Sequence, residues 1–451
     1  SFLRNQVSKE LLEKKIKMEA ELEKKYSNFR ANINGKVVTD NEIEGILATS
    51  TSSKELESAW NTHKAIGKEV AADVIAIVKL RNEIAKSLGY ENYHTMNMTL
   101  SEQNPAEVLA LFDELDNLTK DAFAELKGEM DTYFAKRYNI AKEKLMPWHY
   151  QNRFFQEAPK IYDIDLDQFY KDKDLVSLTA KYYDGINLNV DDIIKKSDLF
   201  EKPGKNQHAY CTDIDRNGDV RVLCNVKPTM SWMNTMLHEN GHAVYSKYFD
   251  PQKPYLLRDA AHTFTTEAIA MMNGRNATNP QWMLDMGIIT PEQKEKIADV
   301  CAKSLRLEQL TFSRWAQVMY RFEKAMYADP DQDLNALWWT LVEKYQLLKK
   351  PEGRNEPDWA SKVHVALYPC YYHNYLMGEL LASQLFYYIS DNVLKNTDYK
   401  NVSFVNHPEV GQYLKEKVFM PGALYQWNDM IQRATGEKLS AKYYAKQFVT
   451  K

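Results

Sequence analysis

MLHENGHAV, residues 236–244, places two histidines four positions apart, with a glutamate directly after the first, in a chain that holds ten histidines. On an α-helix, residues four apart lie on one face, so His238 and His242 can hold the same metal ion. Glu239 lies one step further round the helix and points away from that ion. Because it does not occupy a coordination position, it can reach a water molecule bound to the metal and act as the general base in metal-assisted hydrolysis.

The residues before this stretch predict a helix with one buried side. Pro228, Thr229 and Ser231 are typical of a helix start, and apolar residues recur over 232–237. The alternative is that both histidines are ordinary polar residues on a helix surface. An unpaired imidazole pair is costly in mostly apolar surroundings, which favours the metal site.

A catalytic zinc site needs a third protein ligand and an open position for water. LLRDAAHTFTTEAIAMM, residues 256–272, predicts a second helix that starts near Thr263 or Thr265 and carries Glu267. A carboxylate among small and apolar residues needs a partner, and a metal ion supplies one. The alternative role for Glu267 is helix capping. His262 lies on the approach to this helix, where a hydrogen-bonding role is favoured over metal ligation.

Helical patterns extend over most of the remaining chain. Apolar residues recur at three- and four-residue spacing in 8–30, 55–89 and 105–137. Only residues 215–226 read clearly as strand, because a turn at Asn217-Gly218 leads into alternating apolar residues. The sequence therefore predicts an all-α protein with a short β-hairpin before the metal helix.

Composition excludes several classes of function. The chain has 58 Lys plus Arg against 62 Asp plus Glu, so its net charge of -4 gives no general attraction to nucleic acid or anionic lipid. No run of eighteen apolar residues occurs, and we expect no membrane-spanning segment. Four cysteines without a CxxC pair are too few for a disulfide framework.

The two segments around the metal motif resemble a known family. LHENGHAVYSKYFD (237–250), followed by LLRDAAHTFTTEAIAM (256–271), is similar to the zinc region of the angiotensin-converting-enzyme family of dipeptidyl carboxypeptidases. The resemblance extends to residues 58–90 and 361–376, and the thimet-type oligopeptidases are more distantly similar. It implies two helical halves around a deep cleft and one zinc ion held by His238, His242 and Glu267.

The resemblance also implies a substrate-binding segment in SKVHVALYPCYYHNYL, residues 361–376. Tyr375 would stabilise the oxyanion formed by attack on a peptide carbonyl, with support from His364. Lys362 and Tyr372 would bind the C-terminal carboxylate of the substrate, and Gln151 resembles a third donor. We expect these residues to complete the active site.

Several positions depart from the family pattern. Tyr371 is the alternative to the neighbouring tyrosines, Tyr372 and Tyr375, for the roles given above. Met271 stands where the animal enzymes have an aspartate that orients a zinc histidine, so that hydrogen bond must come from elsewhere. Asn374 replaces an arginine that binds chloride, which argues against chloride activation.

The hairpin has two further implied features. The strand 220–226 resembles the family's edge strand, which would pair with the substrate backbone by strand addition. Cys211 and Cys224 bracket the hairpin much as a family disulfide does, and two reduced cysteines are the alternative.

The resemblance implies a single zinc metallopeptidase domain over residues 1–451. Residues 1–200 would form a mainly helical cleft wall, 201–280 the hairpin and zinc-binding helices, and 281–451 a helical half with the substrate-binding His/Tyr segment. The chain begins at Ser1 rather than Met, and the family's N-terminal lid helices are expected to be missing before it. A cleaved N-terminal fragment of the same protein is therefore a candidate partner.

We predict a peptidyl-dipeptidase-like enzyme that acts on short peptides, with Glu239 as general base. One alternative is a thimet-like endo-acting oligopeptidase. The other is a non-catalytic helical peptide-binding protein with a structural metal site, against which Glu239 argues because such a site needs no base. An extracytoplasmic location, periplasmic or secreted, is slightly favoured over a cytoplasmic one.

Overall fold

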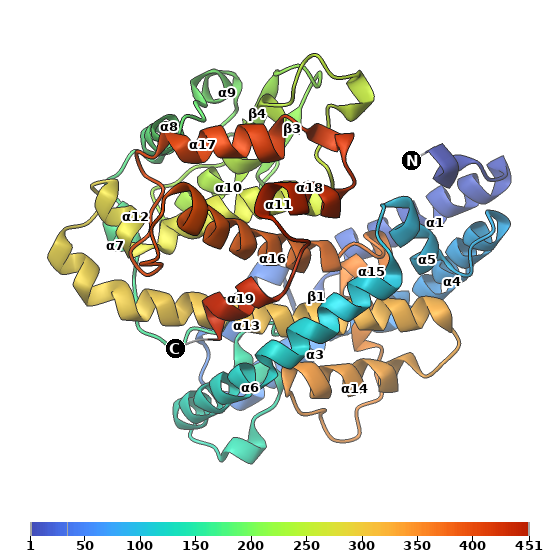
Figure 1. The fold of residues 1–451 in the computed structure, drawn as a ribbon. Coiled ribbons are helices and arrows are strands. Elements are labelled where there is room, and N and C mark those ends of the chain that lie inside the picture. The colour runs from blue at the N-terminus through green and yellow to red at the C-terminus, as the bar shows by residue number, and fades with distance from the viewer. Residues whose placement is uncertain (1, 34, 450–451) are drawn as a thin grey trace. The chain divides into compact units, whose positions relative to one another are not determined.

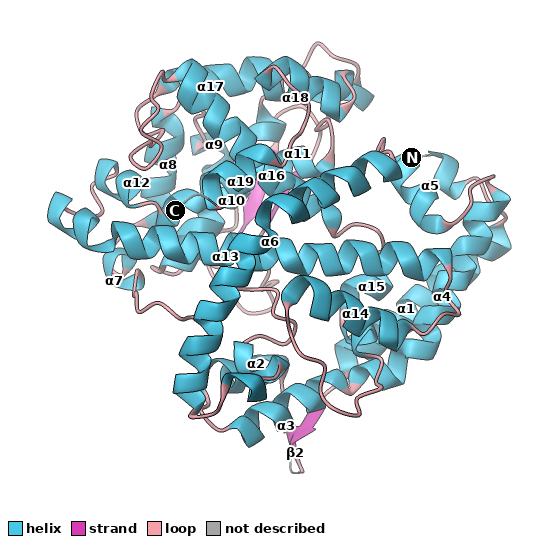
Figure 2. Cartoon of the chain, turned by 60° about the horizontal axis from the view of Figure 1, so that its bottom comes forward, coloured by secondary structure: helices cyan, strands magenta, loops and turns pink. Residues whose placement is uncertain are grey.

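The computed structural model describes residues 2–33 and 35–449. Helices form nearly all of its regular structure, and the described strands make two short antiparallel hairpins, which confirms the predicted all-α class (Figures 1 and 2). Among the described helices, none is long and apolar enough to cross a bilayer. The predictions about missing N-terminal helices and a cleaved fragment lie outside the described residues.

The chain divides into two compact units, each made from two separated stretches of sequence. Unit 1 comprises Ser1–Ile161 and Leu307–Leu376, and unit 2 comprises Tyr162–Arg306 and Met377–Lys451. The chain passes between the units within helices α13 (Pro291–Ala328) and α16 (His373–Tyr388) and after residue 161.

Unit 1 contains eight complete α-helices and one hairpin among its described residues. The helices are α1 (Lys9–Asn28), α2 (Asp40–Thr49), α3 (Ser53–Lys64), α4 (Ile66–Ser87), α5 (Tyr93–Leu100), α6 (Pro105–Tyr138), α14 (Leu334–Gln346) and α15 (Val363–Leu367). The hairpin pairs β1 (Ala31–Ile33) with β2 (Lys36–Val38). Sequence patterns did not predict this hairpin, because strands of three residues are too short to show an alternation.

The predicted single helix over residues 55–89 is wrong in one respect. It is divided at Ala65 into α3 and α4, since Ala65 ends the first helix and precedes the second. Directly after the break, a Cβ atom on Gly67 would lie 2.3 Å from the carbonyl oxygen of Pro357. A close backbone approach therefore fixes α4 against the segment at Pro357, and such an approach leaves no trace in hydrophobic spacing.

Unit 2 carries the metal motif. Its complete described helices are α7 (Asp167–Tyr170), α8 (Leu175–Gly185), α9 (Asp191–Lys196), α10 (Met230–Lys247), α11 (Thr263–Gly274), α12 (Pro280–Asp285), α17 (Pro408–Leu414), α18 (Trp427–Thr435) and α19 (Lys442–Phe448). Its hairpin pairs β3 (Tyr210–Asp213) with β4 (Val220–Leu223), where a hairpin was expected.

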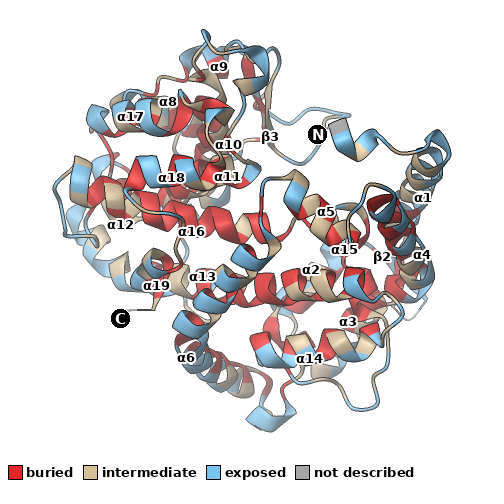
Figure 3. Cartoon of the chain, turned by 45° about the vertical axis from the view of Figure 1, so that its right-hand side comes forward, coloured by how far each residue is buried: buried red, intermediate tan, exposed pale blue. Residues whose placement is uncertain are grey.

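Helices α10 and α11 pack closely against each other and form the centre of unit 2. On α10, Met233, Met236 and Leu237 are completely buried, as the apolar pattern before the motif predicted. Figure 3 colours each helix by the burial of its residues. At Gly241, between the two motif histidines, a Cβ atom would lie 2.7 Å from the Cα atom of Ala270 on α11. Because that distance is too short for non-bonded carbons, only glycine lets the two helix backbones approach this closely.

Candidate active site

Both metal-motif helices begin at side-chain caps. The hydroxyl of Thr229 accepts a hydrogen bond from the backbone N–H of Trp232 and starts α10 two turns before the first motif histidine. The imidazole of His262 accepts from the backbone N–H of Phe264 and caps α11, so its predicted hydrogen-bonding role is confirmed. The predicted start of the second helix near Thr263 is also confirmed.

The two helices bring His238, His242 and Glu267 together. The Nε2 atoms of the two histidines lie 3.2 Å apart, and each lies 3.7 Å from the Oε2 atom of Glu267. Ligands of a tetrahedral zinc ion, bound at about 2.0–2.2 Å, are separated by about 3.3–3.6 Å. Among the described residues, these form the one group of three or more His, Cys, Asp or Glu side chains close enough to share an ion.

The electrostatics of this group also fit a cation. Burial lowers the pKa of His238 to about 4 and that of His242 to about 3, so both rings are neutral and can offer lone pairs to a metal. Burial also raises the pKa of Glu267 to about 7, with a smaller contribution from the negative charge of Glu379. Three converging donor groups in a desolvated site fit a zinc ion by their chemistry as well as by their spacing.

Glu239 lies outside this group, as expected for a residue one step round the helix. Its side chain is buried, with 8% of the residue exposed. The backbone N–H of Cys211 on β3 donates a hydrogen bond to its carboxylate. Burial, with a smaller contribution from the charge of Glu267, raises the pKa of Glu239 to about 7, while the Cys211 hydrogen bond acts in the opposite direction. A carboxylate with such a pKa exchanges protons readily near neutral pH.

Thr266 on α11 supplies the hydrogen-bond partner for a motif histidine that Met271 cannot supply. The Oγ1 atom of Thr266 lies 2.8 Å from Nδ1 of His242. When Nε2 faces a metal, Nδ1 carries the hydrogen and donates it to this hydroxyl, which fixes both the tautomer and the ring orientation. Sequence reasoning missed Thr266, although its position directly before Glu267 on the same helix was a usable signal.

We expect Thr266→Val to weaken zinc binding by about 10- to 100-fold, because the isosteric side chain removes only the hydroxyl that orients His242. Competition with a chelator measures the zinc affinity directly, without reference to turnover. Thr340→Val is the matched control, because its hydroxyl bonds to Ala336 within α14 of unit 1. Unchanged zinc affinity in Thr266→Val would show that the hydroxyl does not orient the ligand.

The hairpin corrects one expectation. Residues 220–226 are not an edge strand, because β4 pairs with β3 on one side and with residues 197–199 on the other. The backbone N–H of Val222 donates to Ser197 Oγ, and that of Cys224 donates to the carbonyl oxygen of Asp198. In the sheet of β3 and β4, the described residues show a second backbone neighbour for β4 but none for β3, so β3 is the outer strand. Strand addition on 220–226 is therefore excluded.

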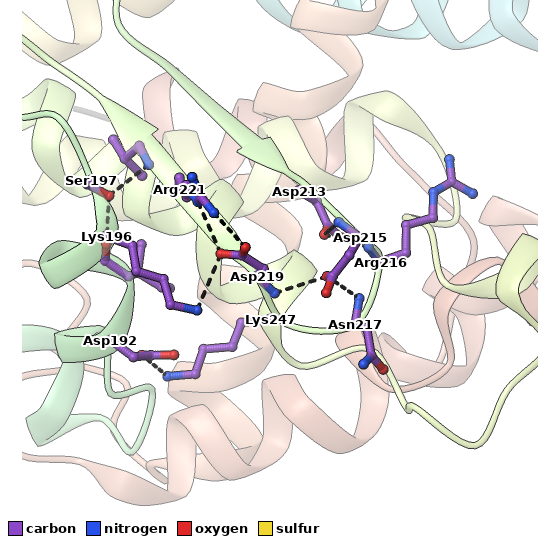
Figure 4. A network of polar contacts seen from close by, with 12 residues as sticks. Asp192, Lys196, Ser197, Asp213, Asp215, Arg216, Asn217, Asp219, Arg221 and Lys247 are labelled. Carbon is purple, nitrogen blue, oxygen red and sulfur yellow. Dashed lines mark hydrogen bonds and ion pairs between the residues drawn. The ribbon is translucent and has the colours of Figure 1, made fainter.

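Polar contacts fix the turn of this hairpin. The carboxylate of Asp219 accepts hydrogen bonds from Arg221 and Lys196 (Figure 4). The closest contacts measure 2.8 and 3.3 Å. The carboxylate of Asp215 accepts from the backbone N–H groups of Asn217 and Asp219. These contacts fix the turn between β3 and β4 and join it to Lys196 on α9. Cys211 and Cys224 are free thiols rather than a disulfide.

Within unit 1, four of the predicted substrate-binding residues form one cluster. The ring of Tyr372 lies 5.2 Å from that of His364 and 5.3 Å from that of Tyr375, between centroids. The Nζ atom of Lys362 lies 5.5 Å from the centroid of the Tyr372 ring. Tyr371 also contacts Tyr375, at 5.2 Å between ring centroids. Burial, with the nearby charge of Lys362, lowers the pKa of His364 to about 4.

Lys362 is buried and is not a surface lysine. Only 7% of the residue is exposed, and burial lowers its pKa to about 8. Its ammonium lies over the rings of Phe154 and Trp315 and donates to the side-chain oxygen of Gln156. Gln151 uses its own side chain elsewhere, since it bonds the carbonyl oxygen of Ala48 and the N–H of Lys160. Gln156, five positions later, is the glutamine that meets Lys362.

Buried polar groups hold the loop and helix start that carry these tyrosines. The carboxylate of Glu323 accepts from the backbone N–H of Cys370, a residue held at φ +56°. The side chain of Gln103 contacts both residues that follow Tyr372: its oxygen lies 2.8 Å from His373 Nε2, and its amide donates to Asn374 Oδ1 at 2.8 Å. Asn374 thus takes a neutral amide partner.

Comparison with known proteins places the chain among peptidases. A family model described as angiotensin-converting enzyme, peptidase M2, matches residues 1–449. The chain is similar to an angiotensin-converting enzyme of Haematobia irritans exigua, with 23% identity over 481 residues that cover 97% of this chain and 77% of the relative. The enzymes of Bos taurus and Sus scrofa are 22% and 23% identical over 354 and 356 residues, which cover 72% of this chain and 27% of each relative. The chain thus spans about a quarter of the length of these two mammalian relatives.

Proposed function

Because the chain belongs to the angiotensin-converting enzyme family of peptidases, we propose that it is a zinc metallopeptidase that releases C-terminal dipeptides from short peptides. The observation that carries the proposal is the convergence of His238, His242 and Glu267, with Glu239 buried beside them and outside the donor group. A structural metal site needs no such base. This argues against a non-catalytic peptide-binding protein.

His238, His242 and Glu267 would hold the zinc ion, which when bound would polarise the scissile carbonyl and acidify a water molecule. Glu239 would accept the proton of the attacking water and then deliver it to the leaving amine. The hydrogen bond from the Cys211 backbone holds the Glu239 carboxylate in one orientation between these two transfers. Its raised pKa suits a group that must both take and give a proton.

The cluster in unit 1 supplies the remaining roles in this proposal. Tyr375 would donate its hydroxyl hydrogen to the oxyanion, with His364 supporting it, as the family resemblance implies. The ring contacts of Tyr375 with Tyr371 and Tyr372 limit its rotation, which favours a donor that is oriented before the substrate binds. On the hairpin, β3 rather than β4 would be the strand that pairs with a peptide backbone.

Recognition of a free C-terminal carboxylate separates a dipeptidyl carboxypeptidase from an endo-acting oligopeptidase. Lys362 would bind this carboxylate, with Tyr372 beside it. An ammonium surrounded by rings and one amide oxygen has no carboxylate partner among the ion pairs of the described residues, so an incoming carboxylate would supply the missing charge.

We expect amidation of the peptide C-terminus to lower kcat/KM by about 10- to 100-fold, because a charge-assisted hydrogen bond contributes about 1.5–3 kcal/mol. Lys362→Met should cause a similar loss on free peptides and almost none on amidated ones. The measurement is kcat/KM for a blocked octapeptide in both forms, with product masses to show whether two residues are removed at a time. Equal cleavage of both forms by the unmodified enzyme, with internal products, would instead identify an endo-acting oligopeptidase.

Two glutamine variants test which glutamine takes part in recognition of the substrate C-terminus. Gln156→Leu should weaken the preference for free peptides, since Gln156 holds the Lys362 ammonium. Gln151 remains the residue that the family resemblance favours, and Gln151→Leu tests that assignment directly. If only Gln151→Leu lowers activity, the glutamine that contacts the substrate is Gln151, as the resemblance implies, and not Gln156.

A further inference from the structure

Unit 2 contains a cavity of about 490 Å³ that the proposed peptidase chemistry does not use. Its walls come from the end of α11 and the segment after it, from α12, from the first half of α13, from α16, from residues 399–401 and from α19. Pockets of roughly 300–1,000 Å³ hold small organic molecules. No residue of the metal group is among the described residues that line this cavity, so it is distinct from the metal site.

One part of the cavity wall is apolar. Met272, Leu305 and Phe386 contribute to it, together with the thiol-bearing residue Cys301. Met272 and Cys301 are 5% and 3% exposed, so this part of the wall is backed by packed protein. Removing the apolar body of a ligand from water against such a wall is favourable.

The polar part of the wall is cationic. Arg275, Lys294 and Lys400 line the cavity, against a single acidic residue, Asp299. The Asp299 side chain is 79% exposed and pairs with Lys303 at 2.7 Å, so it does not neutralise the cations inside. The lining therefore favours a ligand with negative charge.

Lys294 is the cation best placed to meet an anion. Its Nζ atom donates to Asn401 Oδ1 at 2.6 Å and to the side-chain oxygen of Gln281. Both acceptors are neutral amides, and the ion pairs found in the described part of the chain do not include Lys294. A carboxylate accepts a hydrogen bond from an ammonium more strongly than an amide does. Arg275 differs, because Glu379 already forms an ion pair with it.

We propose that this cavity binds a small organic carboxylate with an apolar body, of the arylalkanoate type. The carboxylate accepts hydrogen bonds from Lys294 at the cationic wall, and the apolar body lies against Met272 and Phe386. Met272 is on α11, five positions after Glu267, so the ligand contacts the far end of the helix that carries the proposed third metal ligand. A ligand in this cavity would therefore contact the same helix that carries Glu267.

Methyl resonances of ¹³C-labelled methionine test the proposal on the full chain, with Met272→Leu used to assign the Met272 signal. We expect 3-phenylpropionate to shift this signal saturably, and the neutral 3-phenylpropan-1-ol to bind about tenfold or more weakly. Lys294→Met should weaken 3-phenylpropionate by a similar factor. Lys296→Met, an exposed lysine on the same helix that does not line the cavity, should leave its affinity unchanged.

Several results of this experiment would overturn the proposal. They are the absence of a saturable shift at roughly 10 mM ligand, equal affinity for the acid and the alcohol, and equal losses in the two lysine variants. Displacement of the probe by a substrate peptide would also overturn it, because the probe would then occupy the peptide site. Glu239→Gln should leave the shift intact, which keeps a failure of the peptidase proposal separate from a failure of this one.

Discussion

Replacing Glu239 by glutamine should lower kcat by about 10²–10⁴ while zinc content and fold remain, since general acid–base catalysis contributes on this scale. Glutamine has nearly the same shape, and its side-chain oxygen can still accept the hydrogen bond from the Cys211 backbone. It cannot take a proton from water. The candidate metal group of His238, His242 and Glu267 does not include this residue, so metal binding should be unaffected.

The measurement combines turnover of a blocked peptide, zinc content after gel filtration and thermal unfolding. Glu295→Gln, on an exposed position of α13, is the matched control and should behave as the unmodified protein. Loss of zinc in Glu239→Gln would identify Glu239 as a ligand. Retained turnover would show that another group accepts the proton.

Tyr375→Phe should lower kcat by about 10²–10³ with little change in KM, because it removes one donor that acts on the transition state rather than on the bound substrate. The ring remains, so its contacts with Tyr371 and Tyr372 are kept. Steady-state kinetics on one peptide over a range of concentrations separate the two parameters.

The competing tyrosine provides the control for this experiment. Tyr371→Phe changes a ring that touches Tyr375 from the neighbouring position, and it should retain kcat. The opposite pattern, a normal rate in Tyr375→Phe and a damaged rate in Tyr371→Phe, would move the oxyanion role to Tyr371. Both variants lose one hydroxyl, so a general effect of losing a phenol would appear in both.

The sequence predicted the helical class and both metal helices because their signals are local. Apolar spacing around residues 232–237, the His238-to-His242 interval and the Thr263 start all depend on neighbours within one or two turns. The cluster of Lys362, His364, Tyr372 and Tyr375 came from a family resemblance rather than from spacing.

The parts that the sequence did not predict depend on contacts across long stretches of chain. Gln156 meets Lys362 across 206 positions. The second neighbour of β4 comes from residues 197–199, which no alternation pattern links to the hairpin. Thr266 is a different case, since its bond to His242 spans 24 positions but requires the packing angle of two helices. Each of these contacts is decided by tertiary packing.

The glycine of HENGH shows that this motif carries two kinds of information. His238, Glu239 and His242 are specified by chemistry, whereas Gly241 is specified by the space available to α11 at Ala270. Transferring only His238, Glu239 and His242 to another helix would supply the reactive residues of α10. It would not supply the space that a second helix such as α11 needs to pack against it. The unit that can be transferred is therefore the packed pair of helices, in which the glycine of the motif sets the distance between the two backbones.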